Sequence, residues 1–501
     1  MTAKPPFPSL HAALAAAAAP RLDKVALIHE SGNVTYGEML AKIDNVVRHL
    51  RRLGIGKGDI FAVYGQNTLE HYYCFYAASK MGAILVPLNP HLTAAEVGYS
   101  FHHSEAKILF HDEHVEATAR EGVPADRMLP LTTFHAPCPG ADHAGVEIDP
   151  EADFVVAYSS GTTGTPKAIV LDQAGLVRVG ASAAEMWGIT EADTTVIGLP
   201  LGYMYGINTA SSPVLHAGGT VAMMRRFHPR EALEMFRDHG VTIYMGVPTM
   251  YTMMMDYCSQ RDLGFDLSGM RMLVCSGSPL PPETAARFVG QFGKPLQNYY
   301  GLSEAFPIIG HFFHETEDVT PGSTGRLCPG AVVRIQRPDG SECADGEAGE
   351  AFVRGPGTMK RYNKNPGMTA AAMQGDLFRT GDIVVRDTKG FYTITGRIKD
   401  IIIRGGHNIS PAEVEEALVS HPAVREAAVV GAPDPVFGES PVAFVVLRHG
   451  ARLDLPDLIA HAGKRLSEFK VPQIVHVLAE LPVGKTGKID RRALKDQAER
   501  G

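Results

Sequence analysis

The chain has 501 residues, of which 45% are hydrophobic, so it is long enough to bury more than one core and is expected to fold as several domains. Its 55 acidic and 47 basic residues give a net charge of −8 without a clustered basic stripe, which disfavours nucleic acid as a partner. The six cysteines lie far apart with no CxxC pair. This pattern disfavours a zinc site and a disulfide framework, and it predicts a reducing, cytoplasmic setting.

The first predicted elements are helices. Residues 12–20 read AALAAAAAP and lack the charged leader of a signal peptide, so they predict an alanine-rich surface helix. Residues 35–54 have helical spacing, with Thr35 and Glu38 placed for a capping box and Gly54 for a stop. No apolar run approaches the roughly 20 residues that a membrane-spanning helix needs, so no transmembrane segment is expected.

Farther along the chain, runs rich in Val and Ile alternate with helical segments, which predicts an α/β protein with parallel sheets and crossover helices. From about residue 320, short strands separated by Gly, Pro and Asp predict an antiparallel, β-rich subdomain. After residue 400 the pattern becomes a small α+β unit of about 100 residues. The boundary is predicted at Arg397, giving domains of residues 1–396 and 397–501.

Residues 158–171, YSSGTTGTPKAIVL, are a polar segment between apolar runs. Backbone N–H groups at Gly161 and Gly164 can converge with hydroxyls and the charge of Lys167 on anionic oxygens, which favours a phosphate cradle. The hydroxyls belong to Ser159, Ser160, Thr162, Thr163 and Thr165. Taken alone, such a segment is more often an ordinary polar loop. It is not a Walker A loop, because only two residues separate its glycines and no Ser or Thr follows Lys167.

Four more motifs follow in order: YYGLSEA (299–305), RTGDI (379–383), GRIKDIIIRGGHNISPAEVE (396–415) and LPVGKTGKIDR (481–491). With the glycine-rich segment they give the chain a close resemblance to the adenylate-forming enzymes, specifically the acyl-CoA synthetases, from residue 35 onward. The resemblance implies stacked mixed sheets in a large N-terminal domain and a small, mobile C-terminal domain. It also implies a two-step reaction, in which ATP with Mg²⁺ activates a carboxylic acid to an acyl-adenylate and a thiol, usually coenzyme A, displaces AMP.

The resemblance assigns the triphosphate to one group of residues. It implies that the β- and γ-phosphates are bound by Thr162, Thr163, Gly164 and Lys167. It also implies that Glu304 is the magnesium ligand, since a carboxylate is a hard oxygen donor that suits Mg²⁺. Without the motif, a single Glu is more often a solvated surface charge. The resemblance implies that a second group of residues contacts the adenine and the α-phosphate. Gly277 and Ser278 form the adenine-side loop, Tyr300 stacks on the base and is followed by Gly301, and Ser303 lies near the α-phosphate.

The remaining assignments concern the ribose and the C-terminal domain. Asp382 is placed to accept hydrogen bonds from both ribose hydroxyls, with Arg397 over the ribose and phosphate. Lys488 is the predicted catalytic residue, an ammonium that bridges the incoming carboxylate and the α-phosphate. Rotation of the C-terminal domain about Lys399 is implied between the two steps, bringing Gly405 and Gly406 close to the pantetheine arm. A competing interpretation makes these glycines a plain turn.

The acid-binding side matches the family less well. Tyr203 stands where His is common in relatives, Ala168 replaces a common Gly and Gln173 a common His, and these changes are expected to reshape acid specificity without removing the chemistry. Residues 199–210 contain no carboxylate that could pair with a substrate ammonium, which disfavours an amino acid. The segment YMGVPTMYTMMM, with Gly246, is either an apolar acid pocket or plain core. An aliphatic acid, as in fatty acid metabolism, and an aromatic or alicyclic acid fit equally.

The sequence therefore predicts a cytoplasmic, ATP-dependent acid–CoA ligase whose partners are a small carboxylic acid, ATP and CoA. One alternative is a ligase that loads the pantetheine of a carrier protein, although these residues include no carrier domain, which favours free CoA. Another is a nucleotide-binding sensor without turnover, which Glu304, Asp382, Arg397 and Lys488 disfavour. A homodimer is one assembly compatible with the resemblance, and the sequence does not fix the oligomeric state.

Overall fold

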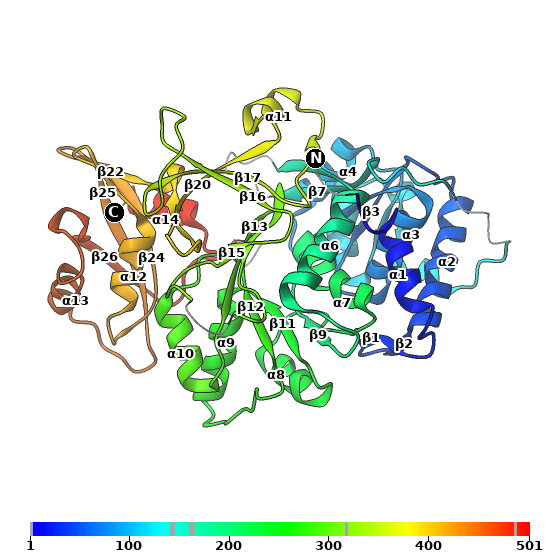
Figure 1. Ribbon diagram of the computed structural model, residues 1–501, viewed down its shortest axis with the longest axis horizontal. Helices are drawn as coiled ribbons and strands as arrows, with labels where there is room; N and C mark the ends of the chain where they lie inside the picture. The colour runs from blue at the N-terminus through cyan, green and yellow to red at the C-terminus, as the bar shows by residue number, and fades with distance from the viewer. Residues whose placement is uncertain (1–3, 141–145, 160–165, 316–318, 485–487, 501) are drawn as a thin grey trace.

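The computed structural model describes residues 4–140, 146–159, 166–315, 319–484 and 488–500. Within these ranges the strands form four sheets. Figure 1 shows the two large sheets with their helices in blue to green, the third sheet in yellow-green beside them, and the C-terminal part of the chain in orange and red at one end. The mixed α/β architecture with a large N-terminal and a smaller C-terminal part confirms the predicted fold class.

The two large sheets contain mostly parallel neighbours, as predicted. The first has nine strands in the order β15 (Arg326–Leu327), β14 (Ala305–Gly310), β13 (Gln297–Leu302), β12 (Met272–Cys275), β11 (Ile243–Gly246), β9 (Thr194–Ile197), β10 (Thr220–Met223), β1 (Val25–His29) and β2 (Gly32–Thr35). The second has seven strands in the order β18 (Arg361–Tyr362), β8 (Lys167–Asp172), β7 (Asp153–Ser159), β4 (Ile84–Leu88), β3 (Ile60–Tyr64), β5 (Leu109–His111) and β6 (Met128–Pro130).

Helices cover both faces of both sheets. The inner helices share one hydrophobic cluster with both sheets; they are α1 (Leu10–Ala18), α2 (Tyr36–Arg52), α3 (Leu69–Met81), α6 (Gln173–Trp187) and α7 (Ser212–Ala217). The outer helices are α4 (Ala94–Ser104) and α5 (Glu116–Gly122) on the seven-stranded sheet, and α8 (Pro229–Asp238), α9 (Pro248–Ser259) and α10 (Pro282–Phe292) on the nine-stranded sheet. Alternate side chains of strand β3 face opposite sides of the sheet: Phe61 and Val63 join the inner cluster, and Ala62 and Tyr64 join the outer one.

Two predicted helices are present, and one of them lies deeper than expected. Helix α2 begins with the predicted capping box, in which Thr35 and Glu38 bond to each other's backbone N–H. It is followed by Gly54, whose φ of +74° belongs to the left-handed region that favours glycine. Helix α1 is not the surface helix that the sequence predicts, because Leu10 and Leu14 are fully buried in the inner cluster.

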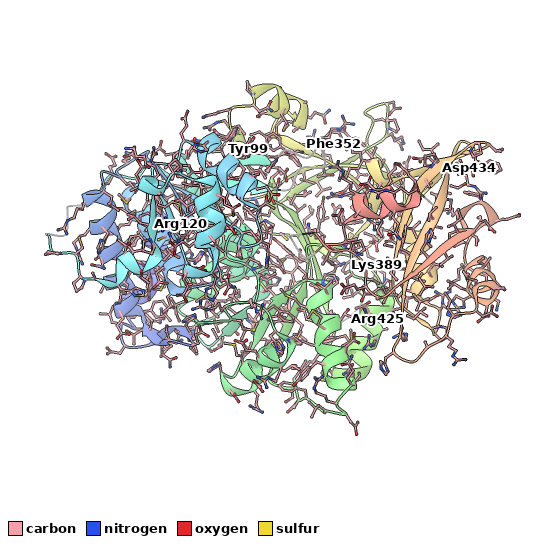
Figure 2. The ribbon with its side chains drawn as sticks, turned by 180° about the vertical axis from the view of Figure 1, so that it is seen from behind. Tyr99, Arg120, Phe352, Lys389, Arg425 and Asp434 are labelled. Carbon is pink, nitrogen blue, oxygen red and sulfur yellow. The ribbon has the colours of Figure 1, made fainter. Side chains whose placement is uncertain are left out.

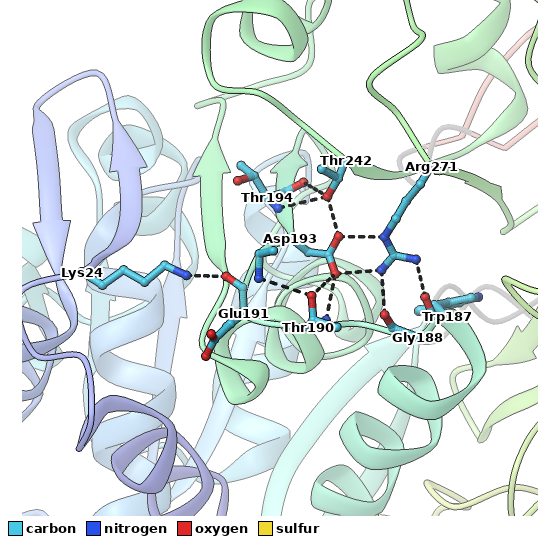
Figure 3. Close-up of polar contacts among 10 residues, drawn as sticks. Lys24, Trp187, Gly188, Thr190, Glu191, Asp193, Thr194, Thr242 and Arg271 are labelled. Atoms are coloured by element: carbon cyan, nitrogen blue, oxygen red, sulfur yellow. Dashed lines mark hydrogen bonds and ion pairs between the residues drawn. The ribbon is translucent and has the colours of Figure 1, made fainter.

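A buried carboxylate fixes the start of strand β9 against its neighbours. Asp193 forms a bidentate pair with Arg271, whose Nε and Nη2 donate over 2.8 Å each to the two carboxylate oxygens (Figure 3). The hydroxyl of Thr242 and the backbone N–H of Thr190 also donate to Asp193, at 2.7 and 2.8 Å. Arg271 further donates to the carbonyl oxygen of Trp187, so this network joins β9, the approaches to β11 and β12, and the end of α6.

The third sheet is the predicted antiparallel subdomain, and it contains β16 (Val332–Gln336), β17 (Ala348–Arg354), β20 (Leu377–Arg386), β19 (Met373–Gln374) and β21 (Tyr392–Arg397). Helix α11 (Pro366–Ala372) lies between β18 and β19 in the chain. The fourth sheet contains β23 (His407–Ile409), β22 (Ile402–Arg404), β25 (Gly438–Leu447), β24 (Val424–Asp434) and β26 (Ile474–Leu478). Its helices are α12 (Pro411–Val419), α13 (Leu455–Gly463) and α14 (Arg491–Ala498).

Candidate functional site

The site is assembled where strands of the first three sheets end. Strand β13 carries Tyr300 and Gly301 and turns at once into β14, so Ser303 and Glu304 lie in the tight turn between Leu302 and Ala305. Beside it, the chain leaves β12 through Gly277 and Ser278. The φ of Gly277 is +84°, and a Cβ added there would meet Val247 Cγ1 at 3.1 Å, so this loop needs glycine for both conformation and space.

Asp382 is the buried anion of the site. Strand pairing between β20 and β21 places it directly opposite Arg397, and the Arg397 Nε lies 2.5 Å from Asp382 Oδ1. The hydroxyl of Tyr300 donates to the other carboxylate oxygen. Although burial opposes it, the Asp382 carboxylate holds the pKa of Arg397 above its ordinary value. Three residues from the YYGLSEA, RTGDI and GRIKD motifs therefore meet in one cluster.

This carboxylate still has an unused acceptor. Asp382 is 1% exposed, and among the described residues its Oδ1 has an ion pair with Arg397 but no hydrogen bond of good geometry. A buried oxygen without a hydrogen-bond donor is costly, so it is suited to accept a hydroxyl from a ligand. Burial and the nearby Asp382 charge raise the pKa of Tyr300 well above its ordinary value, which keeps that phenol protonated as a donor.

A second cluster contains Lys167 and Glu304. Strand β8 begins at Lys167, which pairs with Ser159 across the β7–β8 hairpin. The Lys167 ammonium lies over the ring of Tyr362, 5.4 Å from its centroid, and the hydroxyl of the same tyrosine donates to Glu304 Oε1 at 3.0 Å. The predicted phosphate residues Ser160, Gly161, Thr162, Thr163, Gly164 and Thr165 lie outside the described residues.

Lys488 of the C-terminal part faces these clusters. A Cβ built on Gly277 would lie 3.9 Å from Lys488 Cε, so the lysine reaches the adenine-side loop. Burial and the charge of Arg397 lower the pKa of Lys488, while Asp382 and Glu304 oppose the change. The sequence did not predict this shift, because it arises from burial in the folded chain and from charged residues that lie far away in the sequence. The structure thus brings Lys488, Gly277, Asp382 and Glu304 together.

The predicted hinge and the glycine pair lie at the start of the fourth sheet. Lys399 occupies a short 3₁₀ turn, Ile398–Asp400, between the third and fourth sheets. Burial lowers its pKa, Asp400 opposes this, and Arg397 and Lys167 add to it. Gly405 and Gly406 have φ values of +56° and +85° and form the turn between β22 and β23. The Gly405 N–H donates to Phe437 O at 2.8 Å, just before strand β25.

Aromatic rings surround Gly246. A Cβ on Gly246 would lie 3.0 Å from the Tyr244 ring and 3.2 Å from that of Tyr251, which leaves no room for a side chain. Tyr205, which the sequence did not single out, donates to Gly246 O at 3.3 Å and stacks on Tyr299 with centroids 6.2 Å apart. Tyr203 is half-buried, and burial raises its pKa.

The other acid-side residues take different places. Met254 and Met255 are buried in the outer cluster of the nine-stranded sheet, so this part of the Met-rich segment is plain core. Met250 instead packs with Leu199 and Val247 in a small cluster next to Gly246. Gln173 is buried at the start of α6, where its amide accepts from Ser79 Oγ at 2.6 Å. It therefore serves packing between α3 and α6.

Tyr362, which sequence reasoning missed, contacts two of the predicted site residues, Lys167 and Glu304. It lies on a two-residue strand, which is too short to carry a periodic pattern, and a lone buried tyrosine is usually read as core. Its only sequence signal is its position in the segment GPGTMKRYN, where two glycines and a proline precede a short basic stretch. Its contacts to Lys167 and Glu304 become visible only when strands β8 and β18 are paired.

Two family models match the chain. The model described as AMP-binding enzyme covers residues 14–363, and that of the AMP-binding enzyme C-terminal domain covers residues 413–488. Over 467 residues the chain is 32% identical to a feruloyl-CoA synthase of Amycolatopsis sp, which covers 93% of this chain and 94% of the relative. It is 33% identical over 507 residues to a sulfoacetate–CoA ligase of Cupriavidus necator, covering 98% of each.

Two solved structures of one protein, with and without ATP, are similar to this chain. ATP-bound MatB from Rhodopseudomonas palustris has a TM-score of 0.88 to this chain at 27% identity, covering 98% of this chain and 99% of MatB. The apo form of MatB has a TM-score of 0.79, with 99% of both chains covered. Over the whole chain, the structure is therefore more similar to the ATP-bound form of MatB than to the apo form.

Proposed function

Because this chain belongs to the AMP-binding enzyme family, we propose that it activates a carboxylic acid with ATP and transfers the acyl group to coenzyme A. In the first step the acid carboxylate attacks the α-phosphorus of ATP, the bond to the β-phosphate oxygen breaks, and acyl-adenylate and pyrophosphate form. In the second step the thiol of CoA loses its proton and displaces AMP, giving the thioester. The names of the two relatives, a feruloyl-CoA synthase and a sulfoacetate–CoA ligase, both describe formation of a CoA thioester, which supports this assignment.

The observation that carries the proposal is the meeting of Lys488 with the clusters of Asp382 and Glu304. A carboxylate and a triphosphate repel each other, so the first step needs a cation at the point where they meet. Lys488 supplies that charge from the C-terminal part of the chain. Asp382 Oδ1 supplies the acceptor for a ribose hydroxyl, and Arg397 lies beside it to balance the charge.

Lys167 and Glu304 form the phosphate-binding side of the site. We propose that Lys167 and the adjoining glycine-rich segment hold the β- and γ-phosphates, and that Glu304 is the ligand for Mg²⁺. The donor set fits this ion, because the Tyr362 bond occupies only Oε1 of the half-buried Glu304 and leaves a hard oxygen for the metal. Bound Mg²⁺ would neutralise phosphate charge.

For the second step we propose a rotation of the C-terminal domain, residues 397–501, against residues 1–396, with Lys399 in the hinge. The supporting feature is the short turn Ile398–Asp400, which is the only connection between the third and fourth sheets along the described chain. Rotation would withdraw Lys488 and present the Gly405–Gly406 turn, whose lack of side chains lets a pantetheine arm pass near the backbone.

We propose an apolar acid, either aliphatic or aromatic. Its supports are the tyrosines around Gly246, the cluster of Leu199, Val247 and Met250, and the lack of a carboxylate in residues 199–210. The named acids of the relatives range from feruloyl to sulfoacetate, so identity alone does not choose the acid. We also propose a cytoplasmic location, which the six free cysteines support. No helix in the described ranges is both long and apolar enough for a bilayer.

The test is acid-dependent exchange of labelled pyrophosphate into ATP, run with fatty, aryl and dicarboxylic acids. We expect exchange with at least one apolar acid, and a CoA thioester when CoA is added. Exchange without thioester formation from CoA would instead favour a carrier-protein acceptor. ATP binding without exchange for any acid would contradict the enzyme and favour a sensor. Size-exclusion chromatography of the same sample tests whether the protein is a homodimer.

A further inference from the structure

Residues 359–363 join the two halves of the phosphate side. On one side, the Lys360 N–H donates to Val170 O at 2.9 Å and the Asn363 N–H to Ala168 O at 2.7 Å, both on the strand that begins at Lys167. On the other side, the Met359 N–H donates to Glu304 O at 2.7 Å. The backbone of this segment therefore ties the turn of Glu304 to strand β8.

One side chain of the segment touches both charged groups. Tyr362 is 2% exposed, its ring lies under the ammonium of Lys167, and its hydroxyl donates to Glu304 Oε1. A cation over an aromatic face is attracted by the ring quadrupole. A hydrogen bond to a carboxylate is stronger than one between neutral groups. Burial, followed by the charge of Glu304, raises the pKa of Tyr362, so the phenol remains a donor at neutral pH.

The alternative arrangement is a direct ion pair. An ammonium and a carboxylate this close to a common side chain attract each other, and a pair between them would occupy both groups before the nucleotide binds. In the described part of the chain Lys167 and Glu304 do not form such a pair. Each contacts a different part of the neutral Tyr362 instead, the ring face and the hydroxyl.

We propose that Tyr362 is a positioning residue that keeps Lys167 and Glu304 apart and oriented, so that the ammonium is available to phosphate and the second carboxylate oxygen to the metal ion. This inference rests on the proposed function, because it concerns the same nucleotide site. Tyr362 acts through the two charged residues and contacts no reacting atom. Its loss should therefore alter how the metal–nucleotide complex binds.

Tyr362→Phe is the sharpest variant, since it removes the hydroxyl and keeps the ring. Its matched control is Tyr64→Phe, which removes a buried hydroxyl that donates to Leu92 O at 3.0 Å, on strand β3. Calorimetric titration with ATP, without any acid, is run at several Mg²⁺ concentrations. For Tyr362→Phe we expect the affinity for Mg²⁺–ATP to fall on the order of tenfold, as for a lost hydrogen bond to a charged group. The affinity for metal-free ATP should change little, because the phenylalanine ring still lies under the ammonium of Lys167.

A double-mutant cycle identifies the partner. In a Glu304→Gln background, Tyr362→Phe should cause almost no further loss of Mg²⁺–ATP affinity, because the two residues act through one contact. Independent, additive losses would overturn the proposal, and so would an unchanged Mg²⁺ dependence in Tyr362→Phe. A loss of equal size in Tyr64→Phe would also overturn it, since it would indicate a general effect of a missing buried hydroxyl.

Folding and function are controlled separately. If the thermal midpoint of Tyr362→Phe falls far below that of Tyr64→Phe, the titration is repeated with Thr369→Val, which removes the acceptor of the Tyr362 N–H. We expect a shift of Mg²⁺ dependence in the same direction, and wild-type dependence would overturn the proposal. Failure of the wild-type protein to bind Mg²⁺–ATP would overturn both the function and this inference. If the wild type exchanges pyrophosphate normally and Tyr362→Phe shows the wild-type Mg²⁺ dependence of ATP binding, only this inference is overturned.

Discussion

At the scale of single residues, the fold and the site use the same device, a buried carboxylate beside an arginine. Asp193 faces Arg271 and supports the nine-stranded sheet, while Asp382 faces Arg397 and lines the site. The difference lies in the remaining oxygens. Both oxygens of Asp193 accept hydrogen bonds from the protein, whereas Asp382 Oδ1 has none among the described residues. A saturated carboxylate is structural, and an unsaturated one is suited to a ligand.

Asp193 gives a prediction about acid stability. Burial alone would raise its pKa, but the hydrogen bonds from Arg271, Thr190 and Thr242 outweigh burial and hold it below the ordinary value. A depressed native pKa stabilises the fold above the unfolded value, about 3.9, and this contribution is lost as the pH falls through the native pKa. Asp193→Asn should therefore unfold at a lower temperature than the wild type at pH 7, by an amount that reflects about 2 kcal/mol for the charged hydrogen bonds.

The measurement is the thermal unfolding midpoint of both proteins from pH 7 down to below pH 4. The gap between them should narrow at the acid end, because below about pH 3.9 the unfolded wild type binds a proton at Asp193 that the folded wild type does not bind, which removes the stabilising contribution of the carboxylate. A gap that stays constant over the whole range would contradict the assigned charge state of Asp193.

At the scale of elements, the sequence predicted long, periodic segments well. The capping box and stop of α2 are where the pattern placed them, because this helix has enough residues to show its period. Helix α3 carries no such signal, since it is buried on nearly every side between the two large sheets. Strand β18, with two residues, is too short to show any period.

The same division holds for the site. Motifs identified Asp382, Arg397, Glu304 and Lys488 individually, and the structure brings all four together. The contacts between them could not be predicted, because they depend on strand register, such as the pairing of Asp382 with Arg397 and of Tyr362 with Ile169. Register is set by packing over whole sheets rather than by neighbouring residues in the chain.

At the scale of the whole molecule, charged pairs connect the C-terminal part to helices α9 and α10. Arg425 lies 3.8 Å from Asp256, which also pairs with Arg287, and Arg465 lies 3.7 Å from Glu283. Figure 2 shows Arg425 where the orange strands approach the green helices. These side chains are partly exposed, so each pair is weak and is screened by salt. Such weak contacts are compatible with the domain rotation proposed above.

Asp256→Asn tests this interface. We expect pyrophosphate exchange to fall by no more than about fivefold, because a partly exposed pair is worth about 1 kcal/mol or less. The variant should also lose part of the salt dependence that the wild type shows between low and physiological ionic strength, while its thermal midpoint stays close to that of the wild type. An identical salt dependence in both proteins would show that these charges do not hold the two parts together.

The central claim is that Lys488, from the C-terminal part, supplies the cation for adenylate formation at a site built by the rest of the chain. The direct measurement compares Lys488→Ala with the wild type in two assays, acid-dependent pyrophosphate exchange and thioester formation from preformed acyl-adenylate and CoA. We predict that exchange falls on the order of 100-fold or more, as for a lost electrostatic stabiliser, while thioester formation persists. Exchange at the wild-type rate in Lys488→Ala would contradict the account.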